Sequence, residues 1–176
     1  MFGIGDSASN ALKLLEKDHD EVDALFKEYE SGKEDMKPAQ KQQLATQICE
    51  MLTVHATIEE EIFYPAIRNL DKETKDLVDE AAVEHQSLKD IIGRLEAAPP
   101  SDPLYDAGVK VLAEYVKHHV KEEENELFPK VRSSEIDLDA LGERLMERKS
   151  ELEGQAARSR GRKRGSNSKS QESRAQ

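Results

Sequence analysis

The sequence predicts an all-α protein built around a helical bundle, and three observations support this class. Charged residues make up 36% of the 176-residue chain and aromatic residues 5%, with no Trp, a composition that suits a soluble helical protein. Apolar residues recur at steps of three and four along four segments, which is the spacing of one face of a helix. Proline, glycine and serine residues lie between these segments, where helices end. We therefore expect one domain with a real core, followed by a tail.

The first helix is expected to begin after Ser7 or Ser9 and to end near Glu30. Its apolar stripe consists of Leu12, Leu15, His19, Val22, Phe26 and Tyr29. The second helix is expected to open at Pro38, because proline suits the first helical turn. Its stripe consists of Leu44, Ile48, Met51, His55, Ile58 and Ile62. Pro65 has no amide donor, so this helix should kink or stop within a turn of it.

The third helix should follow Asp71, which is a good N-cap residue. Its inward residues are Val78, Ala81, His85, Leu88, Ile92 and Leu95. A proline-rich segment, 97–103, ends this helix, and the fourth helix should begin with Pro103 near its first turn and continue to Pro129. Its stripe consists of Tyr105, Val109, Leu112, Val116, His119 and Glu123.

A shorter fifth helix is predicted after Asp137, with Leu138, Leu141, Leu145 and Leu152 packing against the bundle or a neighbour. From Gln155 the composition changes to Arg, Lys, Ser and Gly, and we predict no fixed structure there. The expected organisation is a four-helix bundle over residues 1–131, a C-terminal helix over 132–154 and a disordered basic tail over 155–176.

The net charge of −11 hides a strong asymmetry between the body and the tail. From Arg158 onward there are seven Lys or Arg against one Glu, which leaves 19 basic and 36 acidic residues, or −17, on residues 1–157. Such a body should repel nucleic acid and anionic membranes and attract cations. Cys49 is the only cysteine, so an intrachain disulfide cannot form. Without a membrane span or a signal peptide, we expect a cytoplasmic location.

Four of the five histidines lie on the apolar stripes, one on each helix of the bundle. His19 and His85 are 66 residues apart and His55 and His119 are 64 apart, so the first helical hairpin corresponds to the second. Two such hairpins facing each other would bring four histidines together at mid-bundle.

Each hairpin also carries one His-x-x-x-Glu motif, His55 with Glu59 and His119 with Glu123, and a proline follows ten residues after each histidine. Positions i and i+4 lie on one helix face and can hold one cation between them. In this register His119 faces inward, whereas the adjacent His118 is rotated by about 100° away from the stripe.

Buried glutamates without partners would each cost several kcal/mol, a cost that a divalent metal removes. Mixed imidazole and carboxylate ligands suit iron, manganese or zinc, and the absence of thiolates argues against a structural zinc site. Six protein groups leave two six-coordinate metals short of ligands, so water, hydroxide, oxygen or peroxide can occupy the remaining positions.

The lone histidine followed by His-x-x-x-Glu-Glu and an aromatic-Pro, present twice within residues 8–131, resembles the hemerythrin-like HHE cation-binding domain. The resemblance implies an up-down four-helix bundle with a non-haem centre of two iron ions, with manganese and zinc ranked after iron. The matching ligand positions are His19, His55, Glu59, His85, His119 and Glu123, and the two glutamates are expected to bridge the irons.

The sequence differs from the oxygen-carrying hemerythrins in the third helix. Those proteins have a second histidine one turn after the first, where this chain has Lys89. Their last carboxylate also lies five residues after its histidine, so Glu124, or His118 paired with Glu123, remain alternative ligands. Glu60 and Glu124 are either solvated acids or additional ligands and metal relays. The change at Lys89 argues against reversible oxygen carriage.

The resemblance implies a protein that binds or reacts with O2, peroxide or NO, and catalase-like disproportionation is the family-level candidate activity. The alternative is an iron-sensing or iron-holding protein in which metal occupancy controls folding or partner binding. The basic tail is expected to make at most weak, salt-dependent contacts with nucleic acid, because it has no aromatic residue for stacking. The sequence does not predict the oligomeric state.

Overall fold

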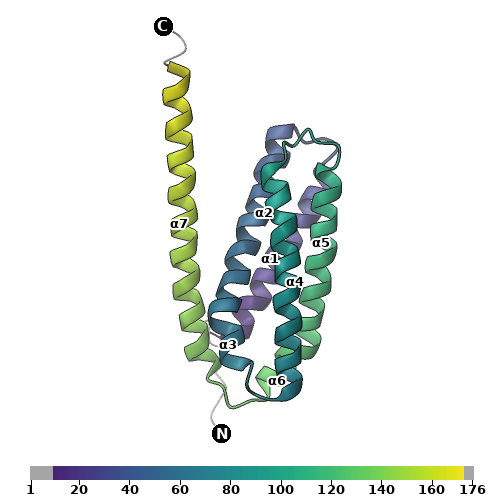
Figure 1. The fold of residues 1–176 in the computed structure, drawn as a ribbon, viewed down its shortest axis with the longest axis vertical. Coiled ribbons are helices and arrows are strands. Elements are labelled where there is room, and N and C mark those ends of the chain that lie inside the picture. The colour runs from purple at the N-terminus through teal and green to yellow at the C-terminus, as the bar shows by residue number, and fades with distance from the viewer. Residues whose placement is uncertain (1–9, 173–176) are drawn as a thin grey trace.

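The computed structural model describes the backbone of residues 10–172 and the side chains of residues 10–161. All regular secondary structure in this range is helical. The four long helices of the bundle are α1 (Ala11–Gly32), α2 (Pro38–Ile58), α4 (Lys72–Ala97) and α5 (Tyr105–Glu122), and they run alternately up and down (Figure 1). The predicted all-α, up-down four-helix bundle is therefore confirmed.

The helix ends follow local capping chemistry. Ser7 and Ser9 lie outside the described residues, and the N-cap of α1 is Asn10, whose side chain accepts from two backbone amides of the first turn. Asp71 caps α4 as predicted, accepting from the amide of Thr74 at 2.7 Å. Pro38 opens α2 as predicted, whereas α5 starts at Tyr105, two residues after Pro103.

Each His-x-x-x-Glu motif ends in a π-helical turn, a feature that the sequence analysis did not predict. These turns are η1 (Glu59–Phe63) and η2 (Glu123–Leu127), followed by the short helices α3 (Tyr64–Ile67) and α6 (Phe128–Arg132). A π-helical turn contains one extra residue and therefore rotates the following side chains by about one position. As a result Phe63 and Tyr64 are buried, while the predicted Ile62 is only partly buried. Met51, which lies before the turn, was also predicted to face inward and is only partly buried.

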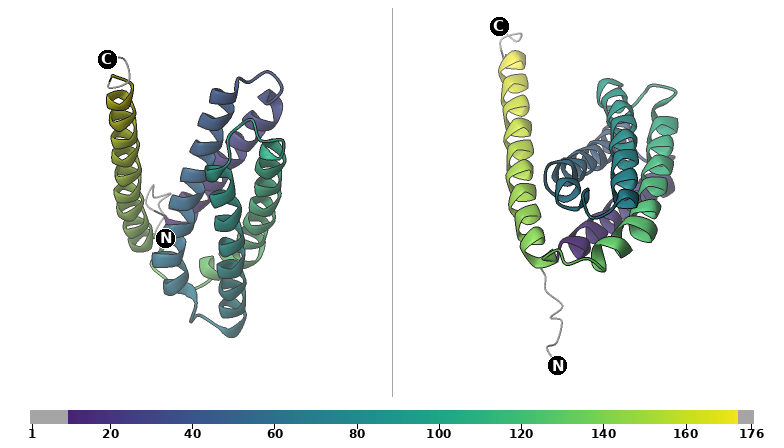
Figure 2. Two further views of the ribbon diagram at one scale, coloured as in Figure 1. Left: turned by 45° about the horizontal axis from the view of Figure 1, so that its top comes forward. Right: turned by 60° about the horizontal axis from the view of Figure 1, so that its bottom comes forward.

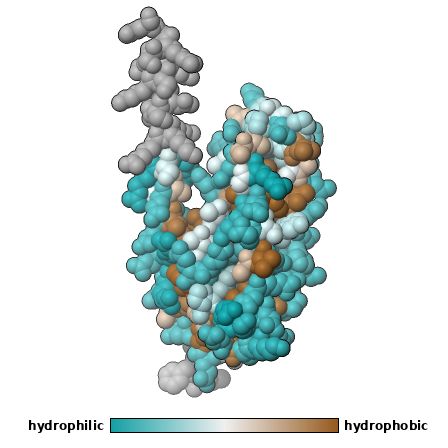
Figure 3. Space-filling model, viewed as in Figure 1, coloured by the Kyte–Doolittle hydropathy of each residue, from teal (hydrophilic) through white to brown (hydrophobic). Residues whose placement is uncertain are grey.

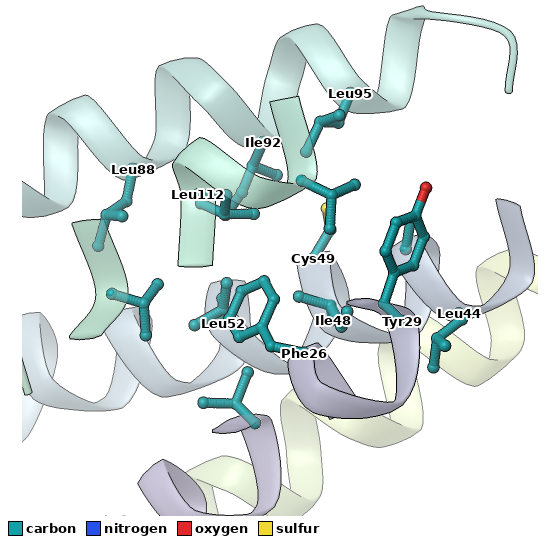
Figure 4. Close-up of a cluster of buried hydrophobic side chains, with 14 of the residues drawn as sticks. Phe26, Tyr29, Leu44, Ile48, Cys49, Leu52, Leu88, Ile92, Leu95 and Leu112 are labelled. Carbon is teal, nitrogen blue, oxygen red and sulfur yellow. The ribbon is translucent and has the colours of Figure 1, made fainter. Parts of the chain in front are cut away.

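His19, His55, His85 and His119 lie at one level of the bundle, which we call the histidine layer. The bundle core consists of two hydrophobic clusters, one on each side of this layer. The upper cluster packs Phe26 against Ile48, Leu52, Leu88 and Leu112, drawn from all four long helices (Figure 4). Each such side chain contributes about 1.5–3 kcal/mol when it is fully buried. The lower cluster includes Leu15, Phe63 and Phe128. These clusters fix the helices above and below the histidines and so hold the histidine layer in place.

The fifth long helix, α7 (Leu138–Glu172), packs outside the bundle along α1 and α2, and its far end projects beside it (Figures 1 and 2). It starts after Asp137, as predicted, but continues past Gln155, where we predicted no fixed structure. No proline follows Pro129, so nothing removes the amide donors that the helix needs. Leu141 and Leu145 bury its first turns in the lower cluster.

Ion pairs extend the attachment of α7 along the bundle. Arg148 bonds Glu61 at 2.7 Å, and Arg160 bonds Glu50 at 2.7 Å. The face of the molecule shown in Figure 3 is mostly hydrophilic, with separated hydrophobic patches. None of the described helices is both long and apolar enough to cross a membrane.

Candidate metal centre

The structure brings the six predicted ligand residues together at one level of the bundle. All six are buried, with 7% or less of each residue exposed, and they come from six helical elements. They are His19, His55, Glu59, His85, His119 and Glu123. Candidate ligand atoms form two groups, each within 4.8 Å, and Glu59 belongs to both. Side chains from four segments distant in sequence thus share one small volume.

The four imidazoles face each other in two pairs through their Nε2 atoms. The Nε2 atoms of His19 and His55 are 3.2 Å apart, and those of His85 and His119 are 3.0 Å apart. The two pairs are related by the internal repeat, since each contains one histidine from each helix of a hairpin. The arrangement provides two nitrogen donors at each of two adjacent positions.

The two glutamates lie between the pairs. The Oε1 atom of Glu59 is 3.3 Å from His55 Nε2, and its Oε2 atom is 3.4 Å from His85 Nε2. The Oε2 atom of Glu123 is 3.3 Å from His19 Nε2 and 3.5 Å from His119 Nε2. Each carboxylate therefore reaches one histidine of both pairs, which is the placement that a bridging ligand requires.

Four further carboxylates hold the outer nitrogens of the histidines. Their partners, with the Nδ1 to oxygen distances, are His19 with Glu124 at 2.8 Å, His85 with Glu60 at 3.0 Å, His55 with Asp18 at 3.3 Å, and His119 with Glu84 at 2.8 Å. An ionised carboxylate only accepts, so each Nδ1 donates its proton and the Nε2 lone pair points inward. This is the tautomer that binds a metal through Nε2.

Without a cation, this hydrogen-bond pattern leaves two Nε2 lone pairs facing each other in each pair. Burial alone lowers the pKa of His55, but Glu59 and Asp18 outweigh it and raise the pKa to about 10. Burial also lowers the pKa of His119, but Glu123 and Glu84 outweigh it and raise the pKa to about 9. Burial and the neighbouring His119 help to lower the pKa of His85. A proton on one imidazole of a pair therefore occupies the position that suits a metal ion.

The buried carboxylate oxygens give an independent test of whether the residues fit a metal. Among the described residues, Glu59 Oε1 and Glu123 Oε2 are fully buried and have no hydrogen-bond partner. Leaving a buried carboxylate oxygen unsatisfied is costly unless a cation compensates it. Nitrogen and oxygen donors without thiolates suit iron, manganese or zinc. The residues therefore fit a divalent metal centre.

Tyr64 also belongs to the site, although it was not among the ligand residues predicted from the sequence. Its hydroxyl donates to Glu123 Oε1 at 2.9 Å and lies 3.4 Å from His85 Nε2. Burial and then Glu123 and Glu59 hold its pKa well above the usual value, so it stays protonated. In the second hairpin the same position is Phe128, which stacks on His19 with ring centroids 5.9 Å apart. The centre is therefore asymmetric.

Asp18 and Glu84 were also missed, although each directly precedes a histidine of the site.

The alternative ligands left open by the sequence occupy distinct places. The side chain of His118 is 64% exposed and lies on the surface beside Glu84, whereas Glu60 and Glu124 contact outer nitrogens of the histidines. Lys89 bonds both oxygens of Glu60, at 2.7 and 2.6 Å. Burial raises the pKa of Cys49 to about 12, so its thiol stays protonated.

Comparisons with known proteins identify the family and support the fold. A sequence profile of the hemerythrin HHE cation binding domain matches residues 10–131. The crystal structure of a hemerythrin HHE cation binding domain-containing protein from Mycobacterium kansasii has a TM-score of 0.69 and 24% identity, covering 84% of this chain and 90% of that one. A protein of Nostoc sp. named DNA nickase is 32% identical over 127 residues, which are 71% of this chain and 34% of the relative. This chain therefore spans about a third of the length of that relative.

Proposed function

Since this chain belongs to the hemerythrin HHE cation binding domain family, we propose that it holds two iron ions in a non-haem centre that binds or reacts with O2, peroxide or NO. The ligands in this proposal are the six buried residues already described, with Glu59 and Glu123 as bridges. The observation that carries the proposal is the pairing of four Nε2 atoms around two carboxylates, each with an unsatisfied buried oxygen.

We favour iron over manganese and zinc because the proposed reactions with O2 or peroxide exchange two electrons. When bound, two adjacent irons each supply a one-electron change, and together these match the two electrons that O2 or peroxide exchanges. The protein residues hold the inward tautomer of each imidazole through the outer carboxylates. Tyr64 keeps a proton within hydrogen-bond distance of Glu123 and so orients that carboxylate.

The cavity beside the histidines supports a very small ligand. It has a volume of about 20 Å3 and is lined mainly by apolar side chains, including Val22, Leu52, Leu88, Ile92 and Val116. A cavity of this volume has space for about one water-sized molecule. O2, NO and peroxide meet this limit, whereas a larger organic substrate does not. The apolar walls also favour uncharged diatomic molecules over ions.

The alternative function is an iron-sensing or iron-holding protein. It is favoured by one contact: Lys149 of α7 bonds Asp18, which in turn holds His55. Through this chain of hydrogen bonds, filling the centre would stabilise the docking of α7 by linkage. In this alternative, metal occupancy controls how stably α7 is docked, and the centre does not react with oxidants.

DNA nicking is the activity in the name of the Nostoc relative, but the charge of this chain disfavours it. Residues 1–157 carry a net charge of −17, which repels DNA phosphates. We expect only weak, salt-dependent contacts from the basic residues after Arg158. A supercoiled plasmid incubated with the iron-loaded protein should therefore stay intact at physiological salt.

The experiment that separates the two main functions is anaerobic loading with Fe2+, followed by separate additions of O2, hydrogen peroxide and NO. The proposed function predicts a new charge-transfer absorption with at least one of these and, for catalase-like activity, O2 released from peroxide. Two bound irons that give no spectral change with any of the three would support the iron-holding alternative. A protein that binds no iron would contradict both.

A further inference from the structure

A second cluster of metal-binding side chains lies on the surface between α4 and α5. It consists of Glu84, His118 and Glu122, whose ligand atoms lie within 4.8 Å of one another. His118 Nε2 is 3.5 Å from Glu84 Oε1 and 3.2 Å from Glu122 Oε1. The side chain of His118 is 64% exposed, so solvent reaches the cluster directly. Two carboxylates and one imidazole are ligands that divalent transition metals accept.

Glu84 connects this cluster to the buried centre. Its Oε1 atom faces His118 on the surface, while its Oε2 atom accepts from His119 Nδ1 at 2.8 Å. A cavity of about 10 Å3 continues inward from Glu84 and Glu122 and is also lined by His119 and Glu123. At its inner end Glu123 is 2% exposed, and its Oε2 atom has no hydrogen-bond partner in the described part of the chain. A cation at the surface thus has an unsatisfied carboxylate ahead of it.

The other hairpin lacks this arrangement, although the repeat gives it equivalent positions. Val54 and Ile58 stand where the second hairpin has His118 and Glu122. Asp18 stands where it has Glu84, and Lys149 of α7 bonds that carboxylate. An ammonium group therefore occupies the outer side of Asp18, whereas both partners of Glu84 within residues 10–161 are histidines.

We propose that Glu84, His118 and Glu122 form a metal-capture site, which takes a hydrated divalent cation from solvent and passes it along this cavity to Glu123. The inference rests on the proposed function only in assuming that the buried centre takes up metal. The capture site binds weakly, because three protein ligands leave the cation partly hydrated. The net charge of −17 on residues 1–157 raises the cation concentration around it.

The test is the rate of Co2+ uptake, followed by visible absorption in a stopped-flow instrument, together with the final ratio of Co2+ to protein. The variant combines His118→Ala with Glu122→Gln. The matched control is Glu114→Gln, which removes one negative charge from an exposed position of α5. At Co2+ concentrations below saturation, uptake by the variant should be slower by about tenfold, as expected for loss of local charge focusing. The control should load like the wild type, and all three should reach the same final ratio.

Equal uptake rates in the variant and the control would overturn the capture site while leaving the buried centre intact. A lower final ratio in the variant alone would also overturn it, because the cluster would then be part of the final site. If the wild type took up no Co2+ and no Fe2+, the proposed function itself would fail. Circular dichroism of the variant should match the wild type, since both substitutions are on the surface.

Discussion

Lys149 of α7 donates a hydrogen bond to Asp18 of α1, and Asp18 also accepts one from Nδ1 of His55. Helix α7 lies beyond residues 10–131, which match the family profile. A residue outside the family domain therefore stabilises a carboxylate that orients one of its histidines. Metal binding and docking of α7 should favour each other for this reason.

Replacing Lys149 by Met should destabilise the protein by about 2 kcal/mol, a value typical of a hydrogen bond to a charged group. Burial raises the pKa of Asp18, but hydrogen bonds from His55 and Lys149 outweigh it and lower the pKa overall. The stabilisation is therefore present above the ordinary Asp pKa and is lost as the pH falls below it. Urea unfolding at pH 7 and pH 3 measures both effects. Arg144→Met, an exposed position on α7, is the control, and an equal loss there would contradict the account.

Removing the Tyr64 hydroxyl with Tyr64→Phe should change the metal spectrum while costing about 1 kcal/mol of stability. The ring remains in the core, whereas the hydroxyl loses its 2.9 Å bond to Glu123 and its longer contacts with His85 and Glu59. The matched control is Tyr29→Phe, which loses a comparable 2.7 Å bond to Asp106 far from the centre. Optical spectra of the iron-loaded proteins and urea unfolding are the measurements. If both variants kept the wild-type spectrum, Tyr64 would have no part in the centre.

Metal uptake should release protons near neutral pH. With pKa values of about 10 and about 9, His55 and His119 are imidazolium cations, protonated on both ring nitrogens, at pH 7.5 in the metal-free protein. A metal bound through Nε2 displaces these protons, so affinity should rise as the pH rises toward 9. Calorimetric titration with Co2+ in two buffers of different ionisation enthalpy counts the released protons. A binding enthalpy that did not depend on the buffer would contradict the proposed pairing.

Removing residues 158–176 should leave the metal spectra intact. In the removed segment, the described contact with the bundle is the ion pair of Arg160 with Glu50 of α2, which is neither a candidate ligand nor one of the outer carboxylates. A longer truncation that starts at residue 146 also removes Lys149 and should lower metal affinity. Competition with a chelator measures this affinity for both truncations. Identical affinities would show that α7 does not support the centre.

The apolar stripes predicted the four helices and most of their buried residues, because buried side chains recur with the period of the helix. The same period placed His119 inward and His118 outward, as the structure has them. The π-helical turns were not predicted, since periodicity assumes a constant turn and Glu59 looks like any other helical residue. Tyr64 was missed for this reason: it faces the centre only after the extra residue of η1.

Glu60 and Glu124 were considered from the sequence, whereas the other two outer carboxylates, Asp18 and Glu84, could have been found from it but were not. Asp18 and Glu84 each precede a histidine of the site, and the repeat of this acid-His pair is a usable signal. Lys149 could not be found in this way, because its role depends on how α7 packs against α1. The length of α7 was also underestimated, since a basic composition resembles that of a disordered segment even when the backbone is helical.

The central claim is tested most directly by counting metal ions in protein loaded anaerobically with Fe2+ and freed of excess metal. The account predicts two irons per chain in the wild type and in His118→Ala, and none retained when Glu59→Ala is combined with Glu123→Ala. The double variant removes both carboxylates that lie between the imidazole pairs. One iron or none in the wild type, or two in the double variant, would contradict a centre bridged by these glutamates.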